Sequence, residues 1–273
     1  MEITIGCDPE LFVTQNGKFR SAHGLIPGTK EHPFKVENGA VQVDGMALEY
    51  NIDPVNNVDD FVHYNQQVMQ QMRDMVPNYE FAIVPSCKFN GNHFRQQPEE
   101  AKELGCIPDF NAYTMQANPR PDNATTMRTA SGHIHIGFVD DVVDPYGDEH
   151  MTRCSTLVKQ LDCYLGLPSI IWDKDTLRRK MYGQAGAFRP KPYGVEYRVL
   201  SNAWLLSENR MRFVFKQTVK AVEDLMSGVR PFNAIKDRPL ITTINTSNTY
   251  SAQQAIRNYM NDGEALVKEA SFL

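Results

Sequence analysis

The sequence has no excess of basic residues: 28 lysines and arginines stand against 33 aspartates and glutamates, for a net charge of −5. This balance argues against a nucleic-acid-binding protein, because such proteins are normally basic. The chain also lacks a run of about eighteen apolar residues, so we expect no membrane partner. Its first residues carry neither the basic nor the apolar segment of a secretion signal. We therefore expect a cytoplasmic protein.

Cysteine pairs and glycine-rich nucleotide motifs are also missing. The five cysteines show no C-x-x-C spacing, which argues against a disulfide framework and against a structural zinc site. The chain has no G-x-x-x-x-G-K-[ST] and no G-x-G-x-x-G, which excludes a standard P-loop or Rossmann site. Only Gly28-Thr29-Lys30 remains as a weak candidate for a phosphate-binding loop, and Lys30 is its cation.

Hydrophobic alternation and helical spacing predict the elements of the fold. Strands are predicted over 2–13, 18–22, 34–37, 40–44, 47–51, 79–85, 132–138 and 195–200. Helices are predicted over 58–76, 98–104, 149–165 and 207–226, with a basic helical turn over 173–182. Asn16-Gly17 predicts a hairpin turn. Asn57 and Ser207 are predicted to cap the first and third long helices. In the tail, residues 239–273, we expect a polar segment and two short helices.

These elements predict an α+β fold in a single domain over residues 1–273. Three long helices would cover one face of an antiparallel sheet and leave the other face open. The segment 86–131 has the least regular pattern. Because a loop of that length inside a compact domain is usually functional or disordered, we interpret it as a possible lid.

Ionisable residues occupy one face of several predicted strands, with apolar residues on the other face. They are Asp8, Glu10, Glu49, His133, His135, Glu196 and Arg198. If these residues all lie on the same face of the sheet, their carboxylates need nearby cations, because like charges held close together would force protonation. Carboxylate oxygens with an occasional imidazole suit Mg²⁺, with Mn²⁺ as the other option. Each short pattern alone is equally compatible with a solvated strand face.

Basic residues cluster around the same part of the chain. They are Arg178, Arg179, Lys180, Arg189, Lys191 and Arg198. These residues are compatible with ordinary surface charge. Beside a carboxylate–metal cluster, however, they would be suited to bind a phosphate or carboxylate, because the guanidinium group of arginine binds such anions bidentately.

Several motifs together resemble a known family. They are Gly6-Cys7-Asp8-Pro9-Glu10, Gly28-Thr29-Lys30, Asp44–Asn51 (D-G-M-A-L-E-Y-N), Gly132–Gly137 (G-H-I-H-I-G) and Tyr182–Arg198. Their order is similar to that of the phage carboxylate–amine ligases of the second type, distant relatives of glutamine synthetase and glutamate–cysteine ligase. The resemblance spans roughly the first 200 residues, and its specificity lies in the combination of motifs.

The resemblance implies a glutamine-synthetase-like catalytic sheet, ATP and Mg²⁺ as cofactors, and amide-bond formation through an acyl phosphate. Metal ligands would come from Asp8, Glu10, Glu49, Glu196 and one of His133 and His135. Glu49, Arg189 and Arg198 would be catalytic, and Arg179, Arg189, Arg198 and Lys30 would contact the nucleotide. The substrates would be a small-molecule or peptide carboxylate and an amine, and a phage-encoded protein would act in the host cytoplasm.

Two alternatives stay open at this point. The His133/His135 face also fits a nucleotide-independent metal hydrolase or oxygenase, since H-x-H occurs in such enzymes. A third possibility is an accessory protein that binds nucleotide without turning it over. The sequence does not identify the substrates, the oligomeric state or the histidine that ligates metal.

Overall fold

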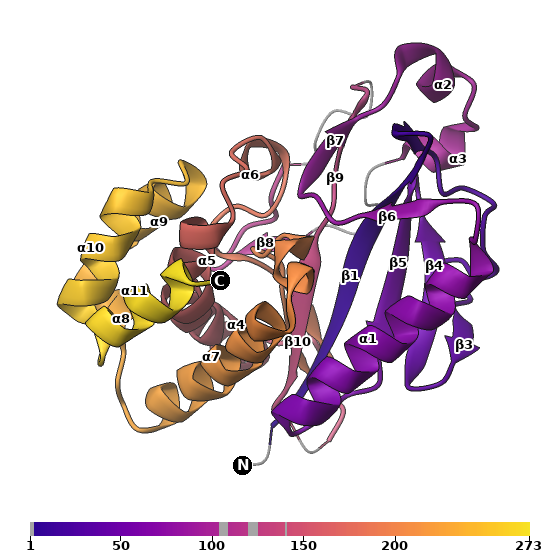
Figure 1. Cartoon of the computed structure of the whole chain (residues 1–273). Helices are drawn as coiled ribbons and strands as arrows, with labels where there is room; N and C mark the ends of the chain where they lie inside the picture. The colour runs from indigo at the N-terminus through magenta and orange to yellow at the C-terminus, as the bar shows by residue number, and fades with distance from the viewer. Residues whose placement is uncertain (1–2, 104–108, 120–124, 140) are drawn as a thin grey trace.

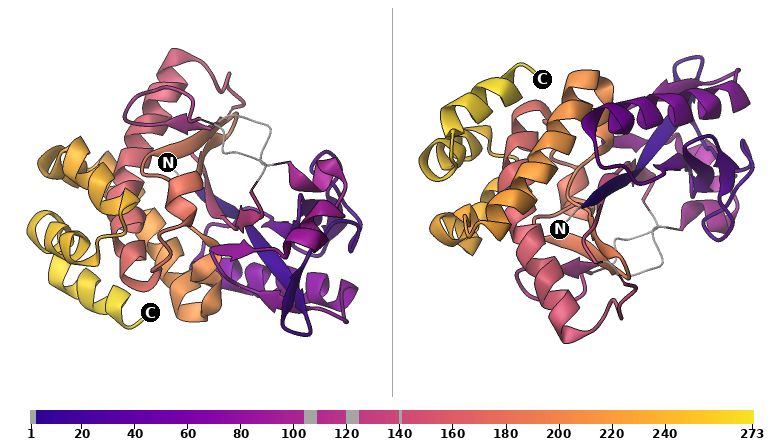
Figure 2. Two further views of the ribbon diagram at one scale, coloured as in Figure 1. Left: turned by 90° about the horizontal axis from the view of Figure 1, so that it is seen from above. Right: turned by 90° about the horizontal axis from the view of Figure 1, so that it is seen from below.

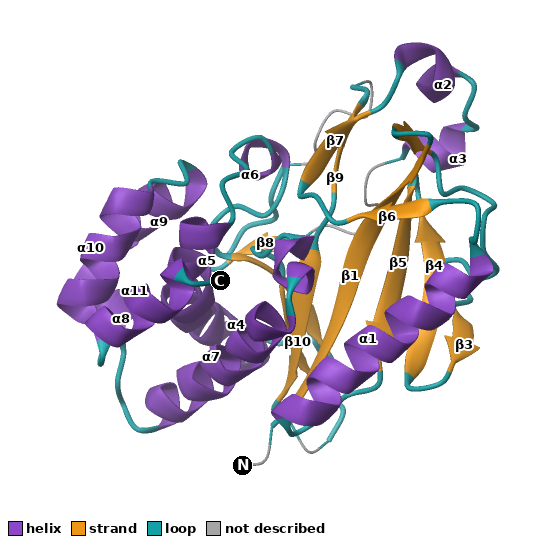
Figure 3. Cartoon of the chain, viewed as in Figure 1, coloured by secondary structure: helices purple, strands orange, loops and turns teal. Residues whose placement is uncertain are grey.

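The computed structural model describes residues 3–103, 109–119, 125–139 and 141–273. The chain forms a mixed α+β fold, as predicted, built on a large antiparallel sheet (Figures 1 and 3). The strands of this sheet are β1 (Thr4–Gln15), β2 (Lys18–Arg20), β3 (Phe34–Val36), β4 (Gly39–Asp44), β5 (Ala47–Ile52), β6 (Glu80–Ala82), β8 (Phe110–Asn111), β10 (Gly132–Gly137), β11 (Ala187–Lys191) and β12 (Gly194–Tyr197).

The long strand β1 lies at the centre of this sheet. The order is β3-β4-β5-β1-β10-β12-β11-β8, and β2 and β6 pair with the far end of β1. The β1–β2 turn confirms the predicted hairpin, because Asn16 and Gly17 both have the positive φ that its turn type requires. Segments from both halves of the chain therefore meet at β1.

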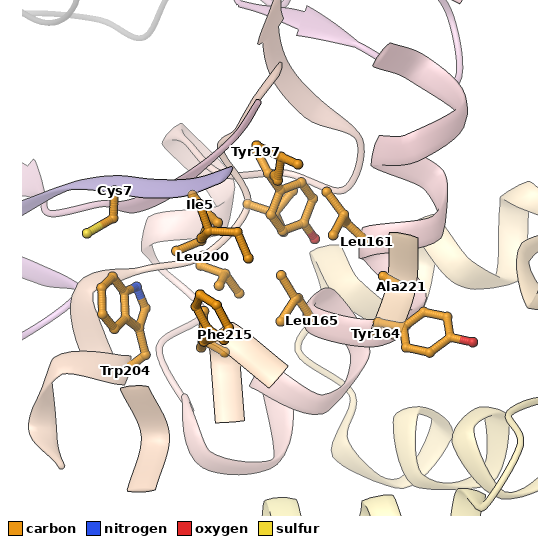
Figure 4. Packing of buried hydrophobic residues seen from close by; sticks show 14 of the residues in the cluster. Ile5, Cys7, Leu161, Tyr164, Leu165, Tyr197, Leu200, Trp204, Phe215 and Ala221 are labelled. Atoms are coloured by element: carbon orange, nitrogen blue, oxygen red, sulfur yellow. The ribbon is translucent and has the colours of Figure 1, made fainter. Parts of the chain in front are cut away.

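Helices cover one face of the sheet. The longer ones are α1 (Val58–Met75), α4 (Asp148–Leu161) and α7 (Glu208–Met226). Asn57 and Ser207 accept backbone N–H groups of the first turns of α1 and α7, which confirms both predicted caps. Buried residues of β1, β12 and these helices share one core; Figure 4 shows Ile5, Tyr197, Leu161 and Phe215 packed together.

Two predicted helices differ from the structure. The helix predicted over 149–165 does not end there: α4 continues through a π-helical turn (Asp162–Gly166) into α5 (Leu167–Trp172). Pro168 is tolerated because it lies in the first turn of α5, where its missing N–H costs no hydrogen bond. The helix predicted over 98–104 is shorter, and its predicted end lies outside the described residues.

The C-terminal region is more helical than predicted. It contains α8 (Pro231–Ile235), α9 (Asp237–Asn245), α10 (Thr249–Tyr259) and α11 (Gly263–Ser271). The segment expected to be polar and irregular instead ends α9, because Leu240 and Ile244 are buried in the core. In all views these helices and the N-terminal strands lie at opposite ends of the molecule (Figure 2).

The segment 86–131 has structure of its own. It contains β7 (Ser86–Lys88), α2 (Gly91–Arg95), α3 (Glu99–Lys102) and β9 (Met127–Thr129), and β7 and β9 pair in a separate two-stranded sheet. The basic turn α6 (Arg178–Met181) and a 3₁₀ turn (Asn202–Leu206) complete the described elements. A second, smaller core joins Phe12 of β1 to Phe89, Phe94 and Ala101 of this segment. The described part of the segment 86–131 therefore packs onto the end of β1.

Candidate functional site

The structure brings the predicted polar strand positions together on the sheet face opposite the main core. Asp8 pairs with His133 across β1 and β10, and Glu10 pairs with Glu49 across β1 and β5. Glu196 of β12 lies opposite His135 of β10 and opposite Arg189 of β11. Residues opposite each other in antiparallel strands have adjacent side chains. One continuous ionic surface therefore crosses five strands.

A first group of ligand atoms lies between β1, β10 and β12. One atom each from Asp8, His135 and Glu196 lies within 4.8 Å of the others. His135 Nε2 is 3.1 Å from Asp8 Oδ2, and its Nδ1 is hydrogen-bonded to Tyr193 Oη at 2.5 Å. Burial acts to raise the pKa of Asp8, but the neighbouring imidazoles of His135 and His133 outweigh it and hold this pKa well below its ordinary value. The carboxylate is therefore kept ionised.

Glu196 is fully buried among cations. Lys191 Nζ lies 2.8 Å and Arg189 Nη1 3.4 Å from its Oε2, and Arg198 contacts its Oε1. Burial and Asp8 act to raise the pKa of Glu196, yet Lys191 and Arg189 lower it below its ordinary value. A buried carboxylate of this kind is stable only while its partners are present.

A second group of ligand atoms consists of carboxylates alone. Oxygens of Glu10, Asp44 and Glu49 lie within 4.8 Å of one another, and Lys30 Nζ is 2.6 Å from Asp44 Oδ1. Burial and then Asp44 raise the pKa of Glu10 to about 7 and raise that of Glu49 well above its ordinary value. Glu49 Oε2 is buried and has no hydrogen-bond partner in the part of the chain that the structure describes. The positive charge of Lys30 therefore does not neutralise the three carboxylates of this group.

His133 lies beside the first group. Its Nδ1 is 3.1 Å from Asp8 Oδ1 and 3.4 Å from Glu196 Oε1. Burial and the Arg198 cation lower the pKa of His133 to about 4, so its imidazole is neutral at neutral pH. His133 Nε2 is buried and has no partner among the described residues. The imidazole can therefore offer a neutral nitrogen to a ligand.

A pocket of about 370 Å³ opens over this surface. Its ionisable lining residues are Asp8, Glu10, Lys30, Glu31, Asp44, Glu49, Glu103, Arg128, His133, Arg189 and Arg198. The remaining lining is Phe12, Gly45, Met46, Ala47, Thr129, Ser131, Met181 and Tyr182. Carboxylates and arginines thus face one shared space, which is a suitable arrangement for polyanions held through cations.

Two predicted basic positions have different surroundings. Arg198 lies in the pocket, with its guanidinium 5.1 Å from the ring centre of Tyr182 and its Nε 3.7 Å from Asp109 Oδ2. Arg179 does not line the pocket: it is buried and donates to Gly183 O and Ser169 Oγ. It is held by the packing of α5 and α6. Its predicted contact with a nucleotide therefore stays a prediction that the pocket lining does not support.

Residues of the segment 86–131 form one wall of the pocket. Glu103, Arg128 and Thr129 line it, while Arg128 donates to the carbonyls of Lys102, Thr125 and Met127. Phe12, Met46 and Ala47 belong both to this wall and to the second core. The prediction that this segment acts as a lid remains a proposal. The structure shows that Glu103, Arg128 and Thr129 form part of the pocket wall.

Sequence reasoning missed Asp44 and Asp109 as members of the site. Asp44 shares a strand face with Gln42, so the alternation of β4 carried a usable signal. Lys191 was predicted only as a possible anion clamp, whereas β11 places it opposite Gly194, beside Glu196. For Asp109 the sequence had no local signal, because it lies beside β8 and reaches Arg198 only through tertiary packing.

Comparison with protein families supports the resemblance for part of the chain. The family model described as phage phiEco32-like COOH.NH2 ligase-type 2 matches residues 128–227. The matched part runs from β9 to the end of α7 and includes His133, His135, Arg189, Glu196 and Arg198. Asp8, Glu10 and Glu49 lie outside it. No curated protein matches the chain.

Proposed function

We propose that the chain is an ATP-dependent carboxylate–amine ligase that forms an amide bond through an acyl phosphate. The observation that carries the proposal is that two ligand groups, Asp8/His135/Glu196 and Glu10/Asp44/Glu49, meet at one arginine-lined pocket. The second group lines this pocket, and the first group reaches it through Asp8. The family match over residues 128–227 supports ligase chemistry for the part that supplies His135 and Glu196.

The two groups fit divalent metal ions. Five carboxylates and one imidazole are hard oxygen and nitrogen donors, which suit Mg²⁺ and also Mn²⁺. Glu49 Oε2 is buried and has no hydrogen-bond partner within residues 3–103, 109–119, 125–139 and 141–273, and the pKa of Glu10 is raised. Both observations indicate too little positive charge around the second group. Metal ions held by these two groups would neutralise the charge that develops in phosphoryl transfer.

Cations of the chain would complete the phosphate site. Arg198 and Arg189 line the pocket on the side of the first group, and Lys30 lines it beside the second. In this proposal Arg198 stabilises the transferring phosphoryl group, and Arg189 and Lys30 hold the nucleotide phosphates or the substrate carboxylate. A guanidinium suits this role because it donates several fixed hydrogen bonds without losing its charge.

The proposed reaction has two steps. A carboxylate oxygen of the acid substrate attacks the γ-phosphorus of ATP, and ADP leaves with the electrons of the broken P–O bond. The nitrogen of the amine then attacks the acyl carbon, inorganic phosphate leaves, and the nitrogen loses a proton. The acyl phosphate hydrolyses readily, so the site must exclude water. In this proposal the wall that contains Glu103, Arg128 and Thr129 helps to exclude water.

The substrates are proposed as a small-molecule or peptide carboxylate and an amine. We propose a cytoplasmic setting, because that compartment supplies ATP and because Cys7, Cys87, Cys154 and Cys163 are free thiols in buried positions. Within the described residues, no helix has the length and apolar character needed to cross a membrane.

Phosphate release from ATP tests the function. The protein would be incubated with ATP, Mg²⁺ and a matrix of amino acids, short peptides and amines, with Glu196→Gln as the matched inactive control. The proposal expects release that needs both an acid and an amine, with amide product detected by mass spectrometry. If no pair stimulates release, and ATP does not bind in calorimetry, the ligase function is wrong. Tightly bound zinc or iron in the same preparation would favour the hydrolase or oxygenase alternative.

A further inference from the structure

Arg178 is a buried arginine outside the pocket that the proposed chemistry does not use. It begins α6, and only 1% of its surface is exposed. Its guanidinium donates to Val199 O at 2.7 Å, Leu200 O at 2.8 Å, Ser131 Oγ at 3.1 Å and Arg198 O at 3.3 Å. A planar group with fixed donors can hold several acceptors in one arrangement, which a lysine ammonium cannot.

The acceptors of Arg178 lie on the two segments that present pocket residues. Ser131 precedes β10, and its backbone N–H donates to Glu10 Oε2 at 2.8 Å. The backbone N–H of Glu10 in turn donates to Ser131 O at 2.9 Å. The other acceptors follow β12 and include the carbonyl of Arg198 itself. Arg178 therefore joins the backbone that orients Glu10 to the backbone that carries Arg198.

Neighbouring residues fix Arg178 in this place. The Asp175 carboxylate accepts the backbone N–H of Arg178 at 2.9 Å and the hydroxyl of Ser86 at 2.5 Å, which ties α6 to β7. Gly183 has a φ of +70°, and a Cβ there would overlap the Arg178 guanidinium. Glycine at this position thus serves both the backbone conformation and the space for the arginine.

We infer that Arg178, acting through Ser131, is a positioning residue for the pocket: it fixes Glu10 against the second ligand group and Arg198 against the first. The inference rests on the proposed metal-dependent function. Groups that orient metal ligands from outside the ligand set commonly control affinity almost as strongly as the ligands do.

The neighbouring Arg179 shows the difference between positioning and packing. It is as deeply buried as Arg178 and also donates to a buried serine hydroxyl, Ser169 Oγ, at 3.2 Å. Ser169 lies in α5, and neither it nor Gly183, the other acceptor of Arg179, lines the pocket. The chain thus offers a matched pair of arginine–serine contacts, one connected to the site and one not.

The experiment compares Ser131→Ala with Ser169→Ala in the full chain. Each variant removes one hydroxyl acceptor of a buried guanidinium, while Ser131→Ala keeps the backbone N–H that reaches Glu10. Mn²⁺ alone serves as the probe, with binding followed by calorimetry and by the electron paramagnetic resonance of free Mn²⁺. Urea unfolding is measured in parallel, and phosphate release where turnover is found.

We expect Ser131→Ala to weaken Mn²⁺ binding about 10-fold, the lower end for groups that orient metal ligands, and Ser169→Ala to leave it unchanged. Both variants should lose similar stability. Arg178→Lys should weaken binding like Ser131→Ala, and Arg179→Lys should not. Equal Mn²⁺ affinities of Ser131→Ala and Ser169→Ala would overturn the inference, as would an Arg178→Lys variant that binds Mn²⁺ like the wild type.

The outcome is separable from that of the proposed function. A wild type that binds Mn²⁺ but consumes no ATP with any substrate pair refutes the ligase proposal and still allows the positioning test. A wild type that binds no Mn²⁺ overturns both, because Arg178 would then have no metal site to position. If the wild type is active and Ser131→Ala and Ser169→Ala bind Mn²⁺ with equal affinity, only the positioning inference is overturned.

Discussion

Replacement of Glu10 by glutamine should stabilise the metal-free protein, and the gain should grow with pH. Burial and the Asp44 carboxylate raise the pKa of Glu10 from 4.5 to about 7. A raised pKa means that the folded state binds this proton more tightly than the unfolded chain does. The ionised carboxylate therefore costs no stability below the unfolded pKa, an increasing amount between the two values, and a constant amount above the folded pKa.

The magnitude follows from the two pKa values. At roughly 1.36 kcal/mol per pKa unit, the cost is about 1.4 kcal/mol at pH 5.5 and about 3 kcal/mol at pH 8. Glutamine has nearly the same shape and its carbonyl oxygen can still accept the Ser131 N–H, but it carries no charge. Glu10→Gln should recover most of that cost.

Urea unfolding of both proteins in the presence of a chelator measures the effect. The difference in free energy of unfolding should favour Glu10→Gln and should increase between pH 5.5 and pH 8. Added Mg²⁺ should reverse the order, because only the wild type keeps the full set of carboxylates. A difference that does not change with pH, or a wild type that is the more stable protein at pH 8 without metal, would refute the electrostatic reasoning.

Three further predictions concern other positions. Glu196→Gln should abolish substrate-dependent phosphate release. It should also lower the free energy of unfolding by about 3 kcal/mol, because Arg189, Lys191 and Arg198 lose their carboxylate partner. Phosphate release at the wild-type rate would contradict the proposed role of Glu196. Lys30→Met should tighten Mn²⁺ binding in calorimetry, since it removes the ammonium beside Asp44; weaker binding would show that the lysine supports the site. Tyr197→Phe removes a 2.7 Å hydrogen bond to Asp162 and should cost about 1 kcal/mol in urea unfolding with unchanged Mn²⁺ affinity, because Tyr197 faces the core; altered affinity would contradict that separation.

Local patterns predicted much of the fold. Alternation over 2–13 and 132–138 predicted strands with polar and apolar faces, since strand periodicity needs only neighbouring residues, and the structure has strands at Thr4–Gln15 and Gly132–Gly137. Caps at Asn57 and Ser207 were equally local. The extension of α4 into α5 was missed, because a π-helical turn has no simple sequence period and Pro168 normally signals a helix boundary.

Individual site residues were predicted to different degrees. Asp8, Glu10, Glu49, His133, His135, Glu196 and Arg198 all line or adjoin the pocket, and each lay on a predicted strand face. Arg179 was predicted beside a nucleotide but donates to groups outside the pocket, and the sequence of a basic helical turn does not distinguish these two surroundings. Asp44 was missed although the alternation of β4 carried a signal for it, and Asp109 was missed because it reaches Arg198 only through tertiary packing.

The sequence by itself determined which side chains share a strand face, because alternation is a local property of an extended chain. It also carried the order of motifs that resembles the ligase family. Only the tertiary structure decided that Asp8 lies opposite His133 and that Glu10 lies opposite Glu49. Strand order and register depend on pairings between residues far apart in the chain. The same packing turned Arg178 and Arg179 inward and left Arg198 in the pocket, where burial and neighbouring charges set its chemistry.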